Sequence, residues 1–338
     1  MSPLQDLAAL AKLVRYHILT STTEAGSGHP TSSLSATDLM TTLFFRYLRA
    51  DLDHPEEANN DRVIFSKGHA APLLYALYAT AGMIKPSEML QLRKLGSPLE
   101  GHPTPGFRYA EAATGSLGQG LSIGIGFALN AKKLDQLPAR TFVLLGDGEM
   151  AEGSVWEAIQ LAAHYRLNNL IGILDVNRMG QSGETLYGHN LEAYAAPIRA
   201  FGWHVITIDG HSLPEIDKAF QEALAIKDRP IMIVAKTFKG AGISFLQDKE
   251  GWHGKPLSKT DLEKALKELG PLNPADTGTV ARPEKTKPAT PKNQEVARPH
   301  YPLGQEIATR KAYGESLTYL ASKYPTVVAL DGDVKNST

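Results

Sequence analysis

The sequence has 338 residues, with 35 basic and 36 acidic side chains, 21 prolines and no cysteine. The balanced charge leaves no net field that would attract nucleic acid, and the absence of cysteine excludes disulfides, thiolate nucleophiles and cysteine-ligated clusters. No apolar run approaches the roughly 18 residues of a membrane span, so we expect a cytoplasmic protein of small-molecule chemistry, with neither nucleic acid nor a membrane as partner.

The first hundred residues combine predicted helices with glycine-flanked histidines. Apolar spacing predicts helices over 4–18, 34–48, 72–81 and 87–95, and the run 62–65 predicts a strand. His29 lies in Gly-Ser-Gly-His-Pro, His69 in Ser-Lys-Gly-His-Ala and His102 in Glu-Gly-His-Pro. Each histidine taken alone is as consistent with a structural role as with a functional one. Because a packed core histidine needs no glycine beside it, three in similar settings indicate one shared site. Imidazoles suit sugar-like ligands, since they bond hydroxyls and shuttle protons near neutral pH.

A glycine-rich loop at 114–120 precedes a predicted helix over 121–131. It is not a dinucleotide fingerprint, because the spacing differs and no strand precedes it. Free amides at a helix start suit a diphosphate. Gly120, Gly124 and Ala128 recur every four residues, which predicts close packing on one face of this helix.

The segment 141–177 predicts a strand, a helix and a second strand. Apolar runs at 141–145 and 170–176 flank a helical pattern at 155–165, which indicates parallel strands joined by a right-handed crossover. Asp147 and Asn177 follow the two strands, so both lie at the edge where open α/β sheets bind ligands. Their oxygens suit a hard cation that carries a diphosphate, and Gly148 lets the backbone come close to it. Either residue alone is more typical of an ordinary turn.

The later part of the chain repeats the alternation of strands and helices. Strands are predicted at 203–208 and 230–236 with a helix at 214–226 between them, so we expect an α/β fold with a parallel sheet and helices on both faces. Lys239 and a further glycine-flanked histidine, His253, follow the last strand.

Composition divides the chain into three parts. Residues 1–269 are the predicted diphosphate- and metal-binding domain. Residues 270–304 hold seven prolines and predict an extended linker. Residues 305–338, with a helix at 307–324 and a strand at 326–330, are expected to be the start of a truncated second domain.

These motifs resemble the thiamine-diphosphate-dependent transketolase family, over essentially the whole chain. The resemblance rests on Gly146-Asp147-Gly148 with Asn177, on the histidine set, and on Arg310 and Ser337. The strings GDGE, DVNRMGQS and KTFKG are similar to the animal-like branch. The resemblance implies a thiamine-diphosphate-binding fold and transfer of a two-carbon ketol unit from a ketose phosphate to an aldose phosphate, in the pentose phosphate pathway.

The resemblance also implies residue roles. It assigns Mg²⁺ or Ca²⁺ to Asp147, Asn177 and the Met179 carbonyl. It assigns thiamine diphosphate to Ser32, His69, Gly115, Ser116, Leu117, Gly148, Asn177, Gln181, Lys239 and His253. Catalysis is assigned to His29, His102 and His253, which would also bind substrate together with Arg310 and Ser337.

The resemblance implies that the truncated second domain at 305–338 binds a pyrimidine. The family's catalytic glutamate lies in the missing part of this domain, so we expect the chain alone to be inactive. A companion chain or fragment would supply the pyrimidine-binding and C-terminal domains, and the complete enzyme would be a homodimer. Two alternatives stay open. One is another thiamine-diphosphate enzyme, such as a deoxyxylulose-phosphate synthase or a dehydrogenase subunit, which the full histidine set with Arg310 disfavours. The other is a non-catalytic thiamine-diphosphate-binding module.

Overall fold

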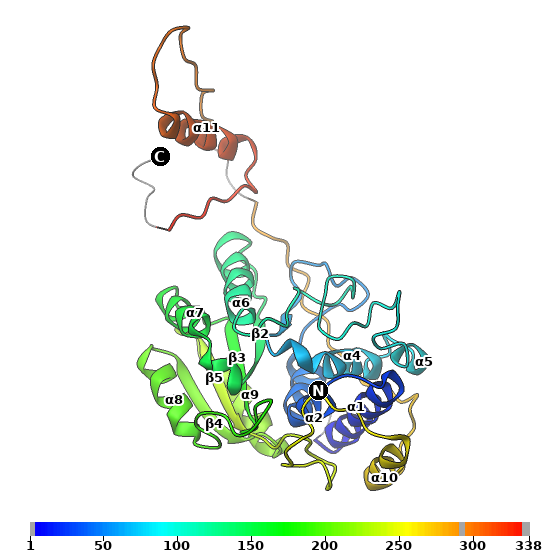
Figure 1. Ribbon diagram of the computed structural model, residues 1–338. Helices are drawn as coiled ribbons and strands as arrows, with labels where there is room; N and C mark the ends of the chain where they lie inside the picture. The colour runs from blue at the N-terminus through cyan, green and yellow to red at the C-terminus, as the bar shows by residue number, and fades with distance from the viewer. Residues whose placement is uncertain (1–3, 291–294, 333–338) are drawn as a thin grey trace. The chain divides into compact units, whose positions relative to one another are not determined.

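A computed structural model of the chain describes residues 4–290 and 295–332. The chain divides into two compact units between Lys287 and Pro288 (Figure 1). The first unit contains the sheet and the helices α1 to α10. The second contains α11 (Thr309–Lys323). Among the described residues, no helix combines the length and the apolar character needed to cross a membrane.

The first unit is built on a parallel five-stranded sheet of order β1-β2-β3-β5-β4. The strands are β1 (Arg62–Phe65), β2 (Thr141–Gly146), β3 (Leu170–Val176), β4 (His204–Asp209) and β5 (Ile231–Lys236). Gly146 at the end of β2 pairs with Asp175 near the end of β3. The two strands therefore end side by side, and Asp147 and Asn177 follow them at one edge, as the sequence predicts.

Helices cover both faces of the sheet, which confirms the predicted fold class. They are α1 (Leu4–Ala25), α2 (Pro30–Ser35), α3 (Thr37–Thr42), α4 (Ala71–Thr80), α5 (Pro86–Met89), α6 (Gly120–Leu129), α7 (Gly153–His164), α8 (Leu191–Ala200), α9 (Leu213–Ala225) and α10 (Lys259–Leu269). Successive strand residues face opposite sides. Phe142 and Leu144 join the apolar core formed with α1, α3, α4, α9 and α10, whereas Val143 and Leu145 join the core formed with α6, α7 and α8. Figure 1 shows these two groups of helices on either side of the strands.

The helix α6 packs directly on the sheet through its small residues. A Cβ atom at Gly124 would lie 2.6 Å from Val143 Cγ2, and one at Gly120 would lie 2.5 Å from Ser66 Cβ. The predicted stripe of small residues therefore brings the start of α6 and the loop before it against the ends of β1 and β2.

Several predicted helix boundaries are wrong. The predicted helix over 34–48 is divided at Ala36 between α2 and α3, and continues as one wider turn over 43–47. The predicted helix over 87–95 ends at Met89, because the chain turns back and the Arg93 N–H donates to Leu99 O. Sequence reasoning missed α8, whose Pro197 is unfavourable inside a helix, and α10, which Ser258 caps.

Part of the predicted 270–304 linker lies along the first unit in an extended conformation. The Gly278 N–H donates to Thr80 O at 2.8 Å, and the Ala50 N–H donates to Ala281 O at 2.9 Å. A Cβ atom at Gly278 would lie 2.5 Å from the Phe45 ring. These contacts hold 270–287 against α4 and the turn after α3, so this half of the linker belongs to the first compact unit.

In the second unit the predicted helix is present as α11, but the predicted strand at 326–330 is wrong. A strand needs a neighbour for its backbone N–H and C=O groups. The described residues of this unit provide no second strand, and 327–331 stay irregular. The assignment of these segments to functional domains stays a prediction.

Candidate functional site

Four histidines from distant parts of the chain meet beyond the carboxyl ends of the strands. The ring of His29 has its centroid 5.3 Å from that of His69, 5.0 Å from that of His253 and 6.4 Å from that of His102. His69 and His253 are 5.6 Å apart. The structure thus brings together His29, His69 and His102, which the sequence predicts to share a site, with His253 beside them. Their individual roles stay predictions.

The glycines beside these histidines allow the loops to pack closely. A Cβ atom at Gly68 would lie 2.7 Å from the Gly115 nitrogen, and one at Gly115 would lie 2.9 Å from the His102 ring. Gly115 also has a φ of +143°, which side-chain-bearing residues rarely adopt. Larger residues at either position would separate the turn that carries His69 from the loop 114–120.

Burial lowers the pKa of all four imidazoles, because a charged ring is poorly solvated there. The pKa falls to about 4 for His29 and His253 and to about 2 for His69, and it is also lowered for His102. Neighbouring positive charges, such as Lys67 beside His69, add to the effect. At neutral pH the cluster therefore consists of neutral imidazoles that can both donate and accept hydrogen bonds.

Lys239 determines which nitrogen of His253 carries the proton. Its Nζ donates to Met179 O at 3.0 Å, to Gly180 O at 2.9 Å and to His253 Nδ1 at 2.8 Å. Burial and the charge of Lys67 lower the pKa of Lys239 to about 8, so it is largely protonated at pH 7. An ammonium can only donate, so Nδ1 accepts and the proton of the neutral ring is on Nε2. His253 therefore offers an Nε2–H donor to a ligand.

Asp147 and Asn177 form the polar edge beneath this cluster. Asp147 is 5% exposed and accepts hydrogen bonds from the Gly148 N–H at 2.9 Å, the Arg178 N–H at 2.6 Å and Thr185 Oγ1 at 3.1 Å. Burial and then the charge of Asp175 raise the pKa of Asp147 to about 6. Asn177 Oδ1 accepts from the Met179 N–H at 3.2 Å. Because burial makes the ionised form of Asp147 unfavourable, a bound cation would stabilise this carboxylate more than it would stabilise an exposed one.

Arg178 lies in the sequence between Asn177 and Met179, two of the three predicted metal ligands, and sequence reasoning gave it no role. It has a left-handed φ of +61°, which is uncommon for a residue with a side chain. Its guanidinium donates twice to Asp248, at 2.8 Å each, and this bidentate contact holds the backbone in place. The partner lies 70 residues further along, so local sequence carried no signal for it.

Two buried charges beneath the site were also missed. Lys67 and Asp175 are 1% and 0% exposed and form an ion pair across the end of β2. Lys67 follows β1 in the Ser-Lys-Gly-His motif, and Asp175 is the one charge inside the apolar run of β3. A lone charge in a strand buried on both faces is the signal that could have identified this pair.

The remaining predicted residues of the first unit come from α2, from the loop before α6 and from the segments after β2 and β3. Ser32 is buried, and its Oγ has no hydrogen-bond partner among the described residues, like His29 Nδ1 and Thr114 Oγ1. Ser116, Leu117 and Gly148 are exposed at the sheet edge. Gln181 lines a cavity of about 210 Å³ together with Met179, Lys239 and His253. Unpartnered buried polar atoms beside an open loop fit a polar ligand with several acceptors and donors.

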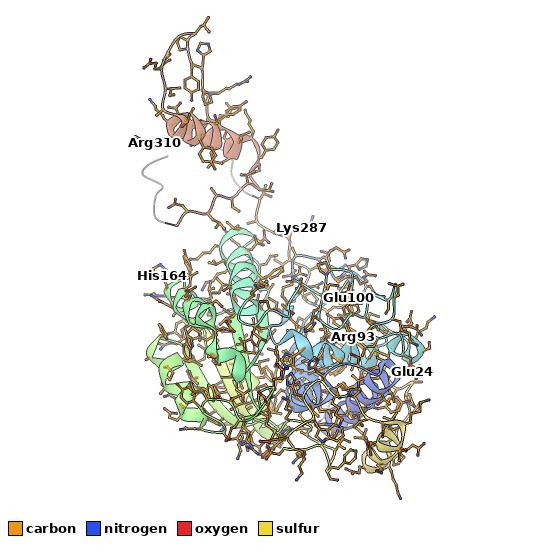
Figure 2. All side chains as sticks on the ribbon, viewed as in Figure 1. Glu24, Arg93, Glu100, His164, Lys287 and Arg310 are labelled. Carbon is orange, nitrogen blue, oxygen red and sulfur yellow. The ribbon has the colours of Figure 1, made fainter. Side chains whose placement is uncertain are left out.

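Two further predicted residues lie outside the first unit. Arg310 lies on α11 in the second unit (Figure 2). Ser337 lies outside the described residues. A larger cavity, of about 620 Å³, lies between α5 and the segment 96–109, but it contains none of the predicted site residues.

The donors at the sheet edge are compatible with a hard cation. Within residues 4–290 and 295–332, no group of three or more His, Asp or Glu side chains is arranged to hold a metal. The predicted set has one carboxylate, one amide oxygen and one backbone carbonyl. Such an oxygen set suits an ion that takes its remaining ligands from a phosphate and water.

Comparisons with known proteins identify the family. The family model described as "Transketolase, thiamine diphosphate binding domain" matches residues 7–324. The chain belongs to the transketolase family. Human transketolase is 46% identical over 338 residues, which cover 99% of this chain and 54% of the human protein.

Solved transketolases share the fold. The enzyme from Campylobacter jejuni has a TM-score of 0.74 and 32% identity, covering 81% of this chain and 44% of that one. A transketolase from Pichia stipitis in complex with sedoheptulose 7-phosphate has a TM-score of 0.72 and 30% identity, covering 81% of this chain and 42% of that one. The chain spans about half the length of the curated relatives that it matches.

Proposed function

We propose that this chain is the diphosphate- and metal-binding part of a transketolase, which moves a two-carbon ketol unit from a ketose phosphate to an aldose phosphate. The observation that carries the proposal is the meeting of four neutral histidines with Asp147 and Asn177 at one edge of a parallel sheet. The sugar phosphate bound to the Pichia stipitis relative supports the class of substrate.

Each part of the site has a proposed role toward thiamine diphosphate and its metal ion. Asp147, Asn177 and the Met179 carbonyl would bind Mg²⁺ or Ca²⁺. The loop 115–117 and Gly148 would hold the diphosphate, with His69 and Lys239 beside it. Ser32 Oγ and Gln181 would contact the rest of the cofactor. When bound, thiamine diphosphate supplies the nucleophilic carbon for cleavage beside a ketose carbonyl.

The chain's own histidines would handle the sugar and its protons. His253 donates from Nε2, because Lys239 occupies Nδ1. His29 and His102 are neutral at pH 7, so each can accept a proton at one nitrogen and donate from the other. These groups would hold the donor's carbonyl and hydroxyls and move protons during cleavage. Arg310 and Ser337 would bind the sugar's phosphate.

The complete enzyme requires more than these residues. The relatives are about twice as long, and we propose that the segment corresponding to their other half, on this polypeptide or a companion chain, completes the site. A homodimer and a cytoplasmic location are part of the same proposal.

Calorimetry tests the binding half of the proposal. The 338-residue chain is expected to bind thiamine diphosphate only when Mg²⁺ or Ca²⁺ is present, and Asp147→Ala should abolish this metal-dependent binding. Unchanged affinity in that variant would refute the metal assignment. Absence of thiamine diphosphate binding by the folded wild-type chain would refute the cofactor role.

A second assay tests the chemistry. Ketol transfer from xylulose 5-phosphate to ribose 5-phosphate is expected after addition of a fragment equivalent to the second half of a relative, and not from this chain alone. His29→Ala should reduce the restored rate without weakening cofactor binding. If cofactor binds to both fragments together and no ketol transfer follows, the proposed reaction is wrong while the binding role stands.

A further inference from the structure

The carboxylate of Asp175 is completely buried and receives hydrogen bonds from four side chains. Thr237 Oγ1 donates to Oδ1 at 2.5 Å. Ser35 Oγ donates to Oδ2 at 2.6 Å, Asn177 Nδ2 donates to Oδ2 at 3.1 Å, and Lys67 Nζ also contacts Oδ2. An ionised carboxylate can only accept, so every neighbour must present a donor to it.

This requirement decides the orientation of the Asn177 side chain. A carboxamide has a donating NH₂ end and an accepting oxygen end, and its two orientations have nearly the same shape. Only the NH₂ end can bond to Asp175. The oxygen end therefore points the other way, where it accepts from the Met179 N–H at 3.2 Å. Oxygen, and not NH₂, is the end that can bind a cation.

Lys67 makes a buried carboxylate possible at this position. Its side chain extends from the end of β1 and passes over Gly146, where a Cβ atom would lie 3.7 Å from the Lys67 Cβ. Its Nζ also donates to Ser32 O at 2.9 Å. The charge of Asp175 is therefore balanced without involving Asn177. The Asn177 amide is therefore not needed to balance charge, and its hydrogen bond to Asp175 sets its orientation.

We propose that Asp175 is a positioning residue that fixes the Asn177 amide with its oxygen toward the metal and diphosphate. The inference rests on the proposed function, because it assigns Asn177 to the cation. Partners of metal ligands commonly change metal affinity by about 10- to 100-fold when they are replaced. Among the proposed metal ligands, the Asp175 side chain forms a hydrogen bond with Asn177, and its charge also acts on Asp147.

Exchanging the two side chains distinguishes this role from simple structural support. In Asp175→Asn the acceptor loses its charge and can also donate, so the Asn177 amide is no longer directed. In Asn177→Asp a second carboxylate faces Asp175 with no proton to donate. We expect each variant to bind Mg²⁺ with thiamine diphosphate at least about tenfold more weakly in calorimetry. In the double variant the amide introduced at position 175 can donate to the carboxylate introduced at position 177, so its affinity should exceed that of both single variants.

Thr237→Val is the matched control, because it removes a hydrogen bond to the other oxygen of Asp175 and leaves the contact with Asn177 intact. It should bind within about threefold of wild type, with folding of each variant checked by far-ultraviolet circular dichroism. The positioning role is overturned if both single variants bind like Thr237→Val, or if the double variant is no better than the singles. If a single variant does not fold, the double variant alone decides. Failure of wild type and Thr237→Val to bind would instead refute the proposed cofactor role.

Discussion

Replacing Asp147 with asparagine is expected to stabilise the cofactor-free protein above pH 6. The pKa of this carboxyl is raised from 3.8 to about 6, first by burial and then by Asp175. A raised pKa means that the folded state holds the proton more tightly than the unfolded chain does. Ionisation therefore costs stability above pH 6, and this cost disappears as the pH falls below about 4.

The magnitude follows from the pKa. At about 1.4 kcal/mol for each pH unit, the change from 3.8 to about 6 corresponds to about 3 kcal/mol of lost stability at pH 7.5. Asparagine removes this cost but weakens the hydrogen bonds from the Gly148 and Arg178 amides, so we expect a net gain of about 1 to 2 kcal/mol. At pH 4 the gain should vanish.

Urea unfolding followed by tryptophan fluorescence measures this difference. All three tryptophans, Trp156, Trp203 and Trp252, lie in the first unit, so the signal reports on it. Thr185→Val is the matched control. It keeps the Asp147 charge but removes a hydrogen bond that stabilises the ionised form, so it should destabilise the protein mainly above pH 6.

Two results would contradict this reasoning. One is a destabilised Asp147→Asn variant whose loss is the same at pH 4 and pH 7.5. The other is stabilisation of both variants at pH 7.5. Addition of Mg²⁺ with thiamine diphosphate should reverse the order of wild type and Asp147→Asn, because a ligand that binds only folded wild type stabilises it by mass action.

Three further predictions concern the site and the core. Lys239→Met should raise the pKa of His253, because the ammonium beside the ring disfavours its charged form. An NMR titration of the histidine protons measures this pKa. An unchanged pKa in the variant would show that the contact is absent in solution. Gly124→Ala should lower the free energy of unfolding in urea by about 1 to 3 kcal/mol, because its Cβ would lie 2.6 Å from Val143. Gly126→Ala, in open space on the same helix, should be neutral or stabilising. Equal effects of the two variants would argue against the close packing. Trp203→Ala should lower the free energy of unfolding by about 3 to 5 kcal/mol, because the ring is 2% exposed and its Nε1–H donates to Ile159 O. A decrease under about 1 kcal/mol would show that the ring is not packed in this way.

Much of the fold could be read from the sequence because β1, β2, β3 and β5 are buried along almost their whole length. β1 and β3 match the predicted ranges residue for residue, β2 and β5 differ by one residue at one end, and β4 is shifted by one residue at both ends. Such strands appear as continuous apolar runs, which are easily recognised. The predicted strand at 326–330 failed for the opposite reason, since an apolar run without a neighbouring strand leaves its backbone groups unpaired.

The helices show where local patterns are insufficient. Pro197 hides α8 from a propensity argument, yet the helix forms because Tyr194, Ala195 and Ile198 are buried against the sheet. The break at Ala36 and the turn at Arg93 are likewise not encoded in the apolar spacing around them. Tertiary burial outweighs local propensity in these segments.

By itself the sequence determined the five strands and most of the helices of the first unit, the polar residues at the strand ends, and a shared site for three glycine-flanked histidines. Only the tertiary structure decided which titratable groups lie close enough to form hydrogen bonds and ion pairs or to change one another's pKa. The proton position on His253, the raised pKa of Asp147 and the pairing of Lys67 with Asp175 depend on distances between segments that are far apart in the chain. The physical reason is that electrostatic and hydrogen-bond energies depend on separation and burial in space, whereas apolar periodicity depends on the neighbouring residues alone.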